Sequence, residues 1–294
     1  MTVLPGTTVT RNVLLAVIVG LLIPLTASTA VQAAPPENYV ALGDSYAAGP
    51  LIPVPIKPWG CLKSDHNYGH LLAPKLGLPA FRDVSCSGAE AEDMTQTQGV
   101  SPEPNPPQFG ALDESTKVVT LQIGGNDIGF SGIAQDCVSL SPLAGNPCQV
   151  KYTNPDGSDQ VAARIDAVGP SVGAVIDGIK ARSPEAEIYV VNYSAIFPHT
   201  GNGELCWPSI PVSWGDIPWL RQTQERLNAM LADQAEAHGA KLVDLYAASV
   251  GHDACQPPGL RWIEPLVPVA GAPVHPNLIG MLAFTDIIYA ATQQ

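Results

Sequence analysis

Basic residues are scarce in this chain. Its 294 residues include 14 lysines and arginines against 27 aspartates and glutamates, which gives a net charge of −13 at pH 7. Binding to nucleic acid or to an anionic membrane surface depends on clustered positive charge, which so acidic a chain does not offer. We therefore expect neither of these as a partner.

Long apolar runs are also scarce, and the one candidate, Val13–Ala27, lies near the beginning of the chain. It follows Arg11, spans about 15 residues and is broken by a proline, whereas a membrane-spanning helix needs about 20. Small residues follow up to Ala33, which is the layout of a secretory signal peptide; a retained membrane anchor is the alternative. We predict a cleaved signal peptide over 1–33, a single monomeric domain over 34–294 without a transmembrane segment, and a protein that is secreted or held at the cell envelope.

Closely spaced cysteine pairs of the Cys-x-x-Cys kind, which bind zinc, are absent. His66 and His70 are four residues apart, but Asn67 stands where the zinc signature has glutamate, so we expect no metal and no organic cofactor. An even number of cysteines in an exported chain indicates disulfides instead. We predict sequential pairing of the six cysteines: Cys61–Cys86, Cys137–Cys148 and Cys206–Cys255.

Segments typical of strands alternate with segments typical of helices. The predicted strands cover residues 39–42, 82–85, 117–123, 187–192 and 241–245. The predicted helices cover about 67–76, 160–182, 219–238 and the stretch from Pro276 to the C-terminus. This alternation predicts an α/β fold, a three-layer flavodoxin-like sandwich with a five-stranded, mostly parallel central sheet.

Ser45 directly follows the first predicted strand, in Gly43-Asp44-Ser45, and open α/β sheets bind ligands at the carboxyl ends of their strands. An ordinary Gly-Asp-Ser turn is the alternative. A serine hydroxyl becomes a good nucleophile when a neighbouring base takes its proton, and histidine suits that role near neutral pH. Among the six histidines, His275 stands out because it lies in a loop just before the last helix.

Acyl transfer also needs hydrogen-bond donors for the oxyanion of its tetrahedral intermediate. Asn126 follows two glycines after the third predicted strand, so its amide can reach the same crevice as Ser45. Gly88 follows the second strand and can offer its backbone N–H, and the N–H of Ser45 is a third donor. Read singly, each of these segments is also compatible with an ordinary turn.

Together, four segments resemble the four blocks of the SGNH (GDSL-type) hydrolase family, in the same order along the chain. They are Gly43-Asp44-Ser45, Gly88, Gly124-Gly125-Asn126-Asp127 and His275-Pro276-Asn277. The placement of the cysteines also resembles the secreted actinobacterial esterases and lipases of this family. The resemblance implies a carboxylic ester hydrolase with Ser45 as nucleophile, His275 as base, and Ser45, Gly88 and Asn126 as the oxyanion hole. The other large serine-hydrolase family has a Gly-x-Ser-x-Gly elbow, which would need glycine in place of Ala47.

One position departs from the family pattern. The family often has aspartate three residues before the histidine, and this chain has Ala272 there. Because a catalytic base needs a partner on its second ring nitrogen, we hypothesise that a backbone carbonyl near Ala272 orients His275. Asp244, Asp253 and Glu264 are rival acids.

The substrate is predicted less specifically, as a small-molecule or lipid ester. Ten apolar loop residues are candidates for an acyl-binding groove, and loop cores beneath the disulfides are the alternative reading. The ten are Leu51, Ile52, Ile56, Trp59, Phe109, Ile196, Phe197, Trp207, Trp214 and Trp262. Two other functions stay open: a carbohydrate acetyl esterase, and a catalytically silent cell-wall binding protein of the same fold.

Overall fold

The central sheet of this computed structural model, which describes residues 1–3, 6 and 37–294, consists of parallel strands. Most of the strands form around a short run of apolar or β-branched residues. The strands are β1 (Asn38–Gly43), β2 (Ala80–Asp83), β3 (Thr116–Gln122), β4 (Glu187–Val191) and β5 (Lys241–Val243). They lie in the order β2-β1-β3-β4-β5, and every neighbouring pair is parallel. This is the predicted five-stranded flavodoxin-like sheet.

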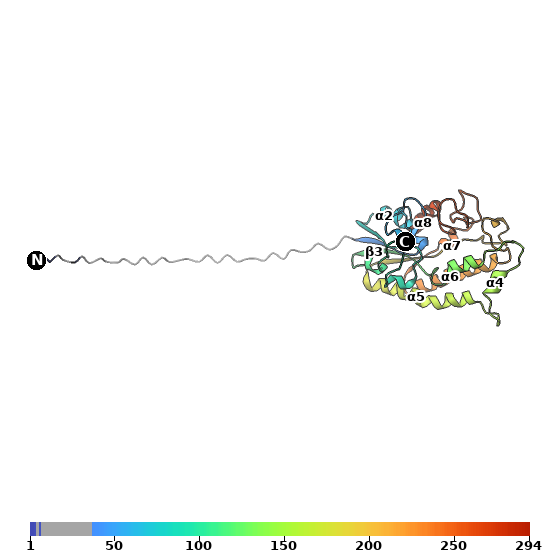
Figure 1. Ribbon diagram of the computed structural model, residues 1–294, viewed down its shortest axis with the longest axis horizontal. Coiled ribbons are helices and arrows are strands. Elements are labelled where there is room, and N and C mark those ends of the chain that lie inside the picture. The colour runs from blue at the N-terminus through green and yellow to red at the C-terminus, as the bar shows by residue number, and fades with distance from the viewer. Residues whose placement is uncertain (4–5, 7–36) are drawn as a thin grey trace. The chain divides into compact units, whose positions relative to one another are not determined.

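Helices cover both faces of the sheet. The long helices α5 (Gln160–Arg182) and α6 (Ile217–Ala237) pack together on one face. The helices α2 (Tyr68–Leu76) and α8 (Leu278–Thr292) pack together on the other, as Figure 1 shows. The central strands are buried on both sides, with all six residues of β1 inaccessible, as expected for a doubly covered parallel sheet. The predicted three-layer sandwich is confirmed.

Most element boundaries agree with the sequence prediction to within two residues. β5 ends at Val243 because Asp244 begins a new element, accepting a hydrogen bond from the N–H of Ala247 with its side chain. Four short α-helices and four 3₁₀ segments in the loops were not predicted, since each is too short to show an apolar period. They are α1 (Ser45–Ala48), α3 (Phe130–Asp136), α4 (Pro147–Lys151), α7 (Leu245–Ala248), and the 3₁₀ segments Trp59–Cys61, Ala91–Met94, Gln108–Ala111 and Glu204–Cys206; α1 follows the serine turn directly.

Three disulfides tie down the loops at the carboxyl edge of the sheet. They join Cys61 to Cys86, Cys137 to Cys148 and Cys206 to Cys255, which are the pairs expected from the sequence. The longest closed segment, between Cys206 and Cys255, has a separation of 49 residues. Because α6 and β5 lie within this segment, the bridge fastens the loop after β4 to the loop after α7.

Residues Pro35–Gln294 form one compact unit, and Met1–Ala34 are assigned to a separate one. The predicted signal peptide over 1–33 lies almost wholly outside the described residues. Among the helices that the structure describes, none combines the length and apolar character needed to cross a bilayer.

Candidate active site

The candidate site lies where the order of the strands reverses, between β1 and β3. At such a switch point the loops after the two strands diverge and leave a crevice. Gly43 ends β1 with φ of 148°, and a side chain there would lie only 2.5 Å from the carbonyl oxygen of Gln122 on β3. Only glycine permits the two strand ends to approach so closely, and this approach directs Ser45 into the crevice.

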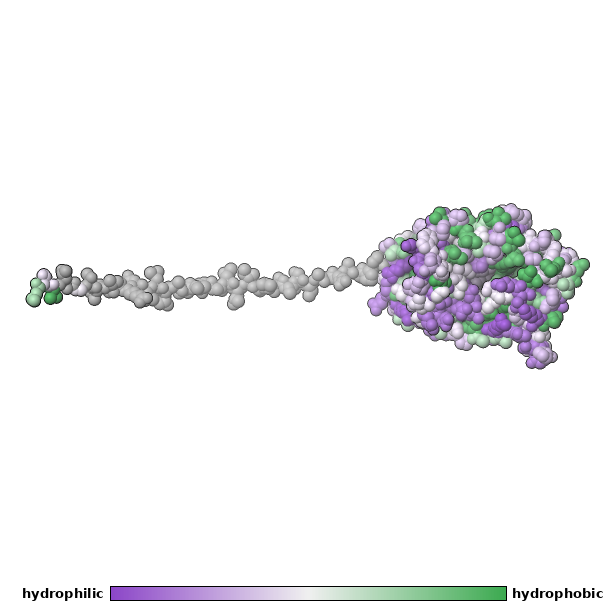
Figure 2. All heavy atoms as spheres, in the orientation of Figure 1, coloured by the Kyte–Doolittle hydropathy of each residue, from purple (hydrophilic) through white to green (hydrophobic). Residues whose placement is uncertain are grey.

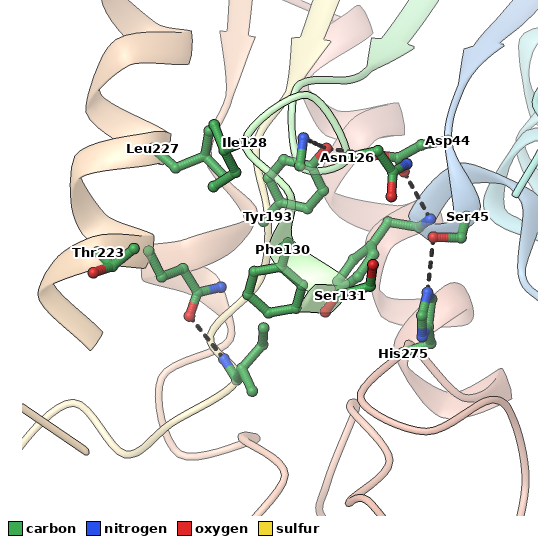
Figure 3. Close-up of a pocket in the computed structure, with 14 residues that line it drawn as sticks. Asp44, Ser45, Asn126, Ile128, Phe130, Ser131, Tyr193, Thr223, Leu227 and His275 are labelled. Carbon is green, nitrogen blue, oxygen red and sulfur yellow. Dashed lines mark hydrogen bonds between the residues drawn. The ribbon is translucent and has the colours of Figure 1, made fainter. Parts of the chain in front are cut away.

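Ser45 and His275 are in direct contact. The His275 Nε2 lies 2.7 Å from the Ser45 Oγ, although 230 residues separate them in the chain (Figure 3). The other ring nitrogen, Nδ1, lies 2.7 Å from the carbonyl oxygen of Pro273. A carbonyl only accepts hydrogen bonds, so Nδ1 carries the ring proton and Nε2 is left as the acceptor for the serine hydroxyl.

The carbonyl that meets the histidine ring belongs to Pro273, the neighbour of Ala272, so the main-chain partner that we hypothesised near Ala272 lies one residue further along the chain. The carbonyl of Ala272 instead accepts the backbone N–H of His275 at 3.2 Å and closes a tight turn. Val274 lies inside this turn with φ of 60°, a left-handed conformation that is strained for a β-branched residue. The turn brings the Pro273 carbonyl to face the ring two residues later.

Burial changes the acid–base behaviour of His275. Removal from solvent lowers the pKa of the imidazole below its ordinary value, and the hydrogen bond to Pro273 acts in the opposite direction. Because burial dominates, the ring stays neutral at physiological pH and Nε2 is free to accept a proton.

The three rival acids have other partners. Asp244 accepts hydrogen bonds from Asn192 and Ala247. Asp253 accepts from the N–H of Cys255 and from the side chain of Gln256. Glu264 is buried against Arg261 and also accepts from Val269 and Asn277. Within residues 37–294, none of the three carboxylates bonds to the ring of His275.

A buried network behind Ser45 links β1, β3 and β4, and sequence analysis missed it. Asp44 accepts the N–H of Tyr46 at 2.9 Å and a short hydrogen bond from the hydroxyl of Tyr193. That hydroxyl also accepts the N–H of Gly125 at 2.8 Å. Burial raises the pKa of Asp44 to about 7, although the Tyr193 hydroxyl and the Tyr46 N–H oppose the shift. The only sign of Tyr193 in the sequence is its position just after the fourth strand.

Asn126 lies in the crevice with one hydrogen of its amide already engaged. Its Nδ2 donates to the carbonyl of Ala89 at 2.9 Å, which leaves the second hydrogen of the amide unused by this bond. Gly88 lies immediately before Ala89, with φ of 81°. The side chain of Gln98 donates to the carbonyl of Ser87 at 2.9 Å and so fixes the peptide that carries the Gly88 N–H. Since Ser45 is the first residue of α1, that helix does not use its N–H.

An apolar cavity opens from the Ser45–His275 pair (Figure 3). Its wall contains Ile128, Phe130, Ile196 and Leu227, and its end towards α6 contains Thr223 and Gln224. The amide of Gln224 is already bonded to the backbone of Ile196 and Ser194. Of the ten loop residues proposed for an acyl groove, only Ile196 lines this cavity.

Phe197 lines a second cavity beside this one, and the other eight lie elsewhere. Trp262, for example, stacks on His252 and packs edge-on against Phe284, as a loop core would.

His66 and His70, considered for a metal, face different carboxylates: His66 contacts Asp65, and His70 lies 3.2 Å from Asp83. On the face shown in Figure 2, green apolar residues gather over the α8 side of the domain and purple polar residues over the α5 side.

This fold and site define a class, the SGNH-type α/β hydrolases. The chain matches the GDSL-like lipase/acylhydrolase family over residues 41–283. It is 38% identical over 258 residues to Lipase 2 of Streptomyces coelicolor, covering 85% of this chain and 83% of that protein. It is 28% identical over 262 residues to Lipase 1 of the same organism, with coverage of 87% and 88%. The chain therefore belongs to the GDSL-like lipase/acylhydrolase family and is a carboxylic ester hydrolase.

Two solved structures have the same fold. Phospholipase A1 from Streptomyces albidoflavus NA297 superimposes with a TM-score of 0.72 at 24% identity, covering 88% of this chain and all of that one (100%). The extracellular lipase from Streptomyces rimosus gives a TM-score of 0.71 at 25% identity, covering 87% and 99%. The actinobacterial lipase and esterase branch, expected from the placement of the cysteines, is confirmed by the family match and by the similarity to Lipase 2 of Streptomyces coelicolor.

Proposed function

We propose that this protein is a secreted esterase or lipase that acts through an acyl-enzyme on Ser45, with His275 as general base. The observation that carries the proposal is the continuous chain of contacts from Ser45 Oγ to His275 Nε2 and from His275 Nδ1 to the Pro273 carbonyl, each 2.7 Å long. In this arrangement the main chain supplies the orienting acceptor that an aspartate supplies in other serine hydrolases.

The reaction follows from this geometry. Ser45 Oγ attacks the ester carbonyl carbon while His275 Nε2 takes the hydroxyl proton, and the carbonyl oxygen becomes an oxyanion. Donors from the N–H of Ser45, the N–H of Gly88 and the side chain of Asn126 stabilise that charge. The imidazolium then gives its proton to the leaving alkoxide, and the acyl-enzyme forms. Water, activated by the same histidine, releases the acid and restores Ser45.

The surroundings of the site favour an ester with an apolar acyl group. The cavity beside Ser45 is walled mainly by aliphatic and aromatic side chains, and the polar atoms of Gln224 and Tyr193 already have protein partners. The hydroxyls of Ser131 and Thr223 also line it, but a sugar would need a larger set of converging polar groups, so the mainly apolar cavity favours a lipid or other apolar ester. The relatives named lipases, and the Streptomyces rimosus structure titled an extracellular lipase, support the same substrate class and secretion. We further propose cleavage near Ala33, a monomeric mature domain over 34–294, and activity without a cofactor.

Hydrolysis of p-nitrophenyl esters from acetate to palmitate, with wild type beside Ser45→Ala, tests the proposal. We expect the substitution to abolish turnover while far-ultraviolet circular dichroism and Tm stay unchanged. Covalent labelling by an organophosphonate should be lost in the same variant. Equal turnover in both proteins would overturn the assignment of Ser45. Absence of turnover in both, on these esters and on sugar acetates, would favour a silent binding protein.

A further inference from the structure

A second apolar cavity lies beside the one that opens at Ser45. Every residue that lines it is apolar or a disulfide cysteine. The lining is Phe130, Ile133, Ala134, Cys137, Val138, Ile196, Phe197, Ile210, Pro211, Val212, Leu220, Leu266 and Val274. With so few hydrogen-bonding groups, such a space suits hydrocarbon better than water or a polar ligand.

The two cavities follow one another along the same pair of helices. On α6, Leu220 lines the second cavity, while Thr223, Gln224 and Leu227 line the first. These positions are 3, 4 and 7 residues apart and share one face of the helix. Three residues of α3 and the residue that caps it have the same spacing and line the second cavity: Phe130, Ile133, Ala134 and Cys137. The pair is therefore a single apolar path between α3 and α6 that begins at Ser45.

Phe130 and Ile196 line both cavities and form the wall between them. The backbone of Ile196 is fixed on both sides, since its N–H donates to Gln224 and its carbonyl accepts the N–H of Ala254. Phe130 is half-buried at the first position of α3, directly after Gly129 in a left-handed conformation. Ile196 is thus the fixed part of the wall, and the phenyl ring of Phe130 is the part that one substitution removes.

We propose that the first cavity binds the acyl chain of the ester and that Phe130 sets its length limit by closing the path to the second cavity. This inference depends on the proposed function, because it takes the acyl group to be carried on Ser45. It assigns the second cavity as an extension of the acyl site that longer chains enter when the wall is removed. Figure 3 shows Phe130 at the side of the first cavity, between the Ser45–His275 end and α6.

The test compares kcat/KM across p-nitrophenyl esters of increasing acyl length for wild type and Phe130→Ala. Each methylene that newly enters an apolar site contributes a factor of about four. We expect the ratio of kcat/KM on long esters to kcat/KM on short esters to rise in Phe130→Ala by about that factor for each added methylene. Phe81→Ala is the matched control, because it removes another half-buried phenyl, stacked on Tyr39 far from the path, and should leave the profile unaltered.

A filling substitution in the second cavity makes the test specific. Ala134 lines only the second cavity, so Ala134→Leu should leave the wild-type profile unchanged but cancel the gain when combined with Phe130→Ala. If Ala134→Leu alone lowered kcat/KM for the longer esters, the acyl chain would already enter the second cavity in wild type, and Phe130 would not close it. An unchanged profile in Phe130→Ala would overturn the length limit. The length limit would also be overturned if Phe130→Ala changed the kcat/KM profile only when the alcohol, and not the acyl chain, was lengthened in a series of alkyl acetates.

Organophosphonate titration of each variant separates this failure from failure of the proposed function. If Phe130→Ala is fully labelled on Ser45 by the organophosphonate and yet keeps the wild-type kcat/KM profile, only the length limit assigned to Phe130 fails. Wild-type protein that hydrolyses esters without labelling counts against the acyl-enzyme itself.

Discussion

The hydroxyl of Tyr46 donates a hydrogen bond of 2.7 Å to the carbonyl of Val274, so the residue after Ser45 holds the residue before His275. The aromatic ring of Tyr46 also lies against the imidazole, with 5.1 Å between the ring centres. The two partners of the site come from distant segments of the chain, and Val274 occupies a strained backbone conformation. This tether therefore keeps the Pro273–His275 turn in register with Ser45.

Replacing Tyr46 by phenylalanine should lower kcat while leaving KM nearly unchanged. The ring remains in place, but the loop loses its hydrogen bond, and small displacements of a catalytic base are costly; we expect a loss of about tenfold. Tyr39→Phe is the matched control, because the Tyr39 hydroxyl is also buried and hydrogen-bonded, to Thr120 in the sheet. Both variants should lose about 1 kcal/mol of stability in urea unfolding. Equal kcat values in the two variants would show that Tyr46 only stabilises the fold.

The pH dependence of kcat/KM should reflect the partly buried imidazole of His275. His275 must be neutral to accept the proton of Ser45, and burial lowers its pKa below the ordinary value of 6.5. Activity should therefore persist as the pH falls to 6.5, and its acid limb should have its midpoint below that value. Initial rates on p-nitrophenyl butyrate, read at the isosbestic wavelength, measure this limb, and the rate of organophosphonate labelling provides an independent check. A midpoint above 6.5 would contradict a lowered pKa of His275, and a midpoint near 7 would match Asp44, whose pKa burial raises to about 7.

The positions of Ser45 and Asn126 at one edge of the sheet could be predicted from the sequence, because they depend only on strand order and direction. Ser45 and Asn126 follow β1 and β3, and the carboxyl ends of parallel strands share an edge. Which carbonyl accepts the hydrogen bond from the ring of His275 depends on the turn at Val274, and no local sequence pattern indicates that turn. The acyl cavity depended on α3, whose seven residues are too few for periodicity to show. Tertiary packing decided both.

Glu264 and Asp253 should differ in their effect on stability but not in their effect on the acid limb. Glu264 is 1% exposed and lies 2.9 Å from Arg261 and 2.7 Å from the N–H of Val269. Glu264→Gln leaves the buried guanidinium without its counter-charge and should cost on the order of 3 kcal/mol. Asp253→Asn removes no ion pair of this kind and should cost less. Urea unfolding and pH–rate profiles of both variants measure the two effects.

If either amide variant shifted the acid limb or abolished turnover while remaining folded, that carboxylate would be the orienting acid. The pKa of Glu264 is held below its usual range by its hydrogen bonds and Arg261, which outweigh burial. Its stabilisation is therefore present above the unfolded-state pKa and is lost as the pH falls through the folded-state value. Wild type should consequently approach the stability of Glu264→Gln in acid, which the same urea experiments at pH 3 and pH 7 will show.

Gly88 and Gly77 give a matched pair for the role of the Gly88 N–H in the oxyanion hole. Both have left-handed φ, 81° and 66°, and a side chain at either position would meet no atom within 3.5 Å. Alanine should therefore cost about 1 kcal/mol of stability at each position, through backbone strain alone.

At Gly88 the strain also rotates the peptide that Gln98 holds, and so turns its N–H away from the oxyanion. Because removal of one oxyanion donor costs about 100-fold or more in kcat, we expect a partial loss, about 10- to 100-fold, in Gly88→Ala. Gly77→Ala should keep the wild-type kcat, since Gly77 ends α2 on the outer layer. Steady-state kinetics on one short ester, with Tm for each variant, make the comparison, and equal kcat values in the two alanine variants would remove Gly88 from the oxyanion hole.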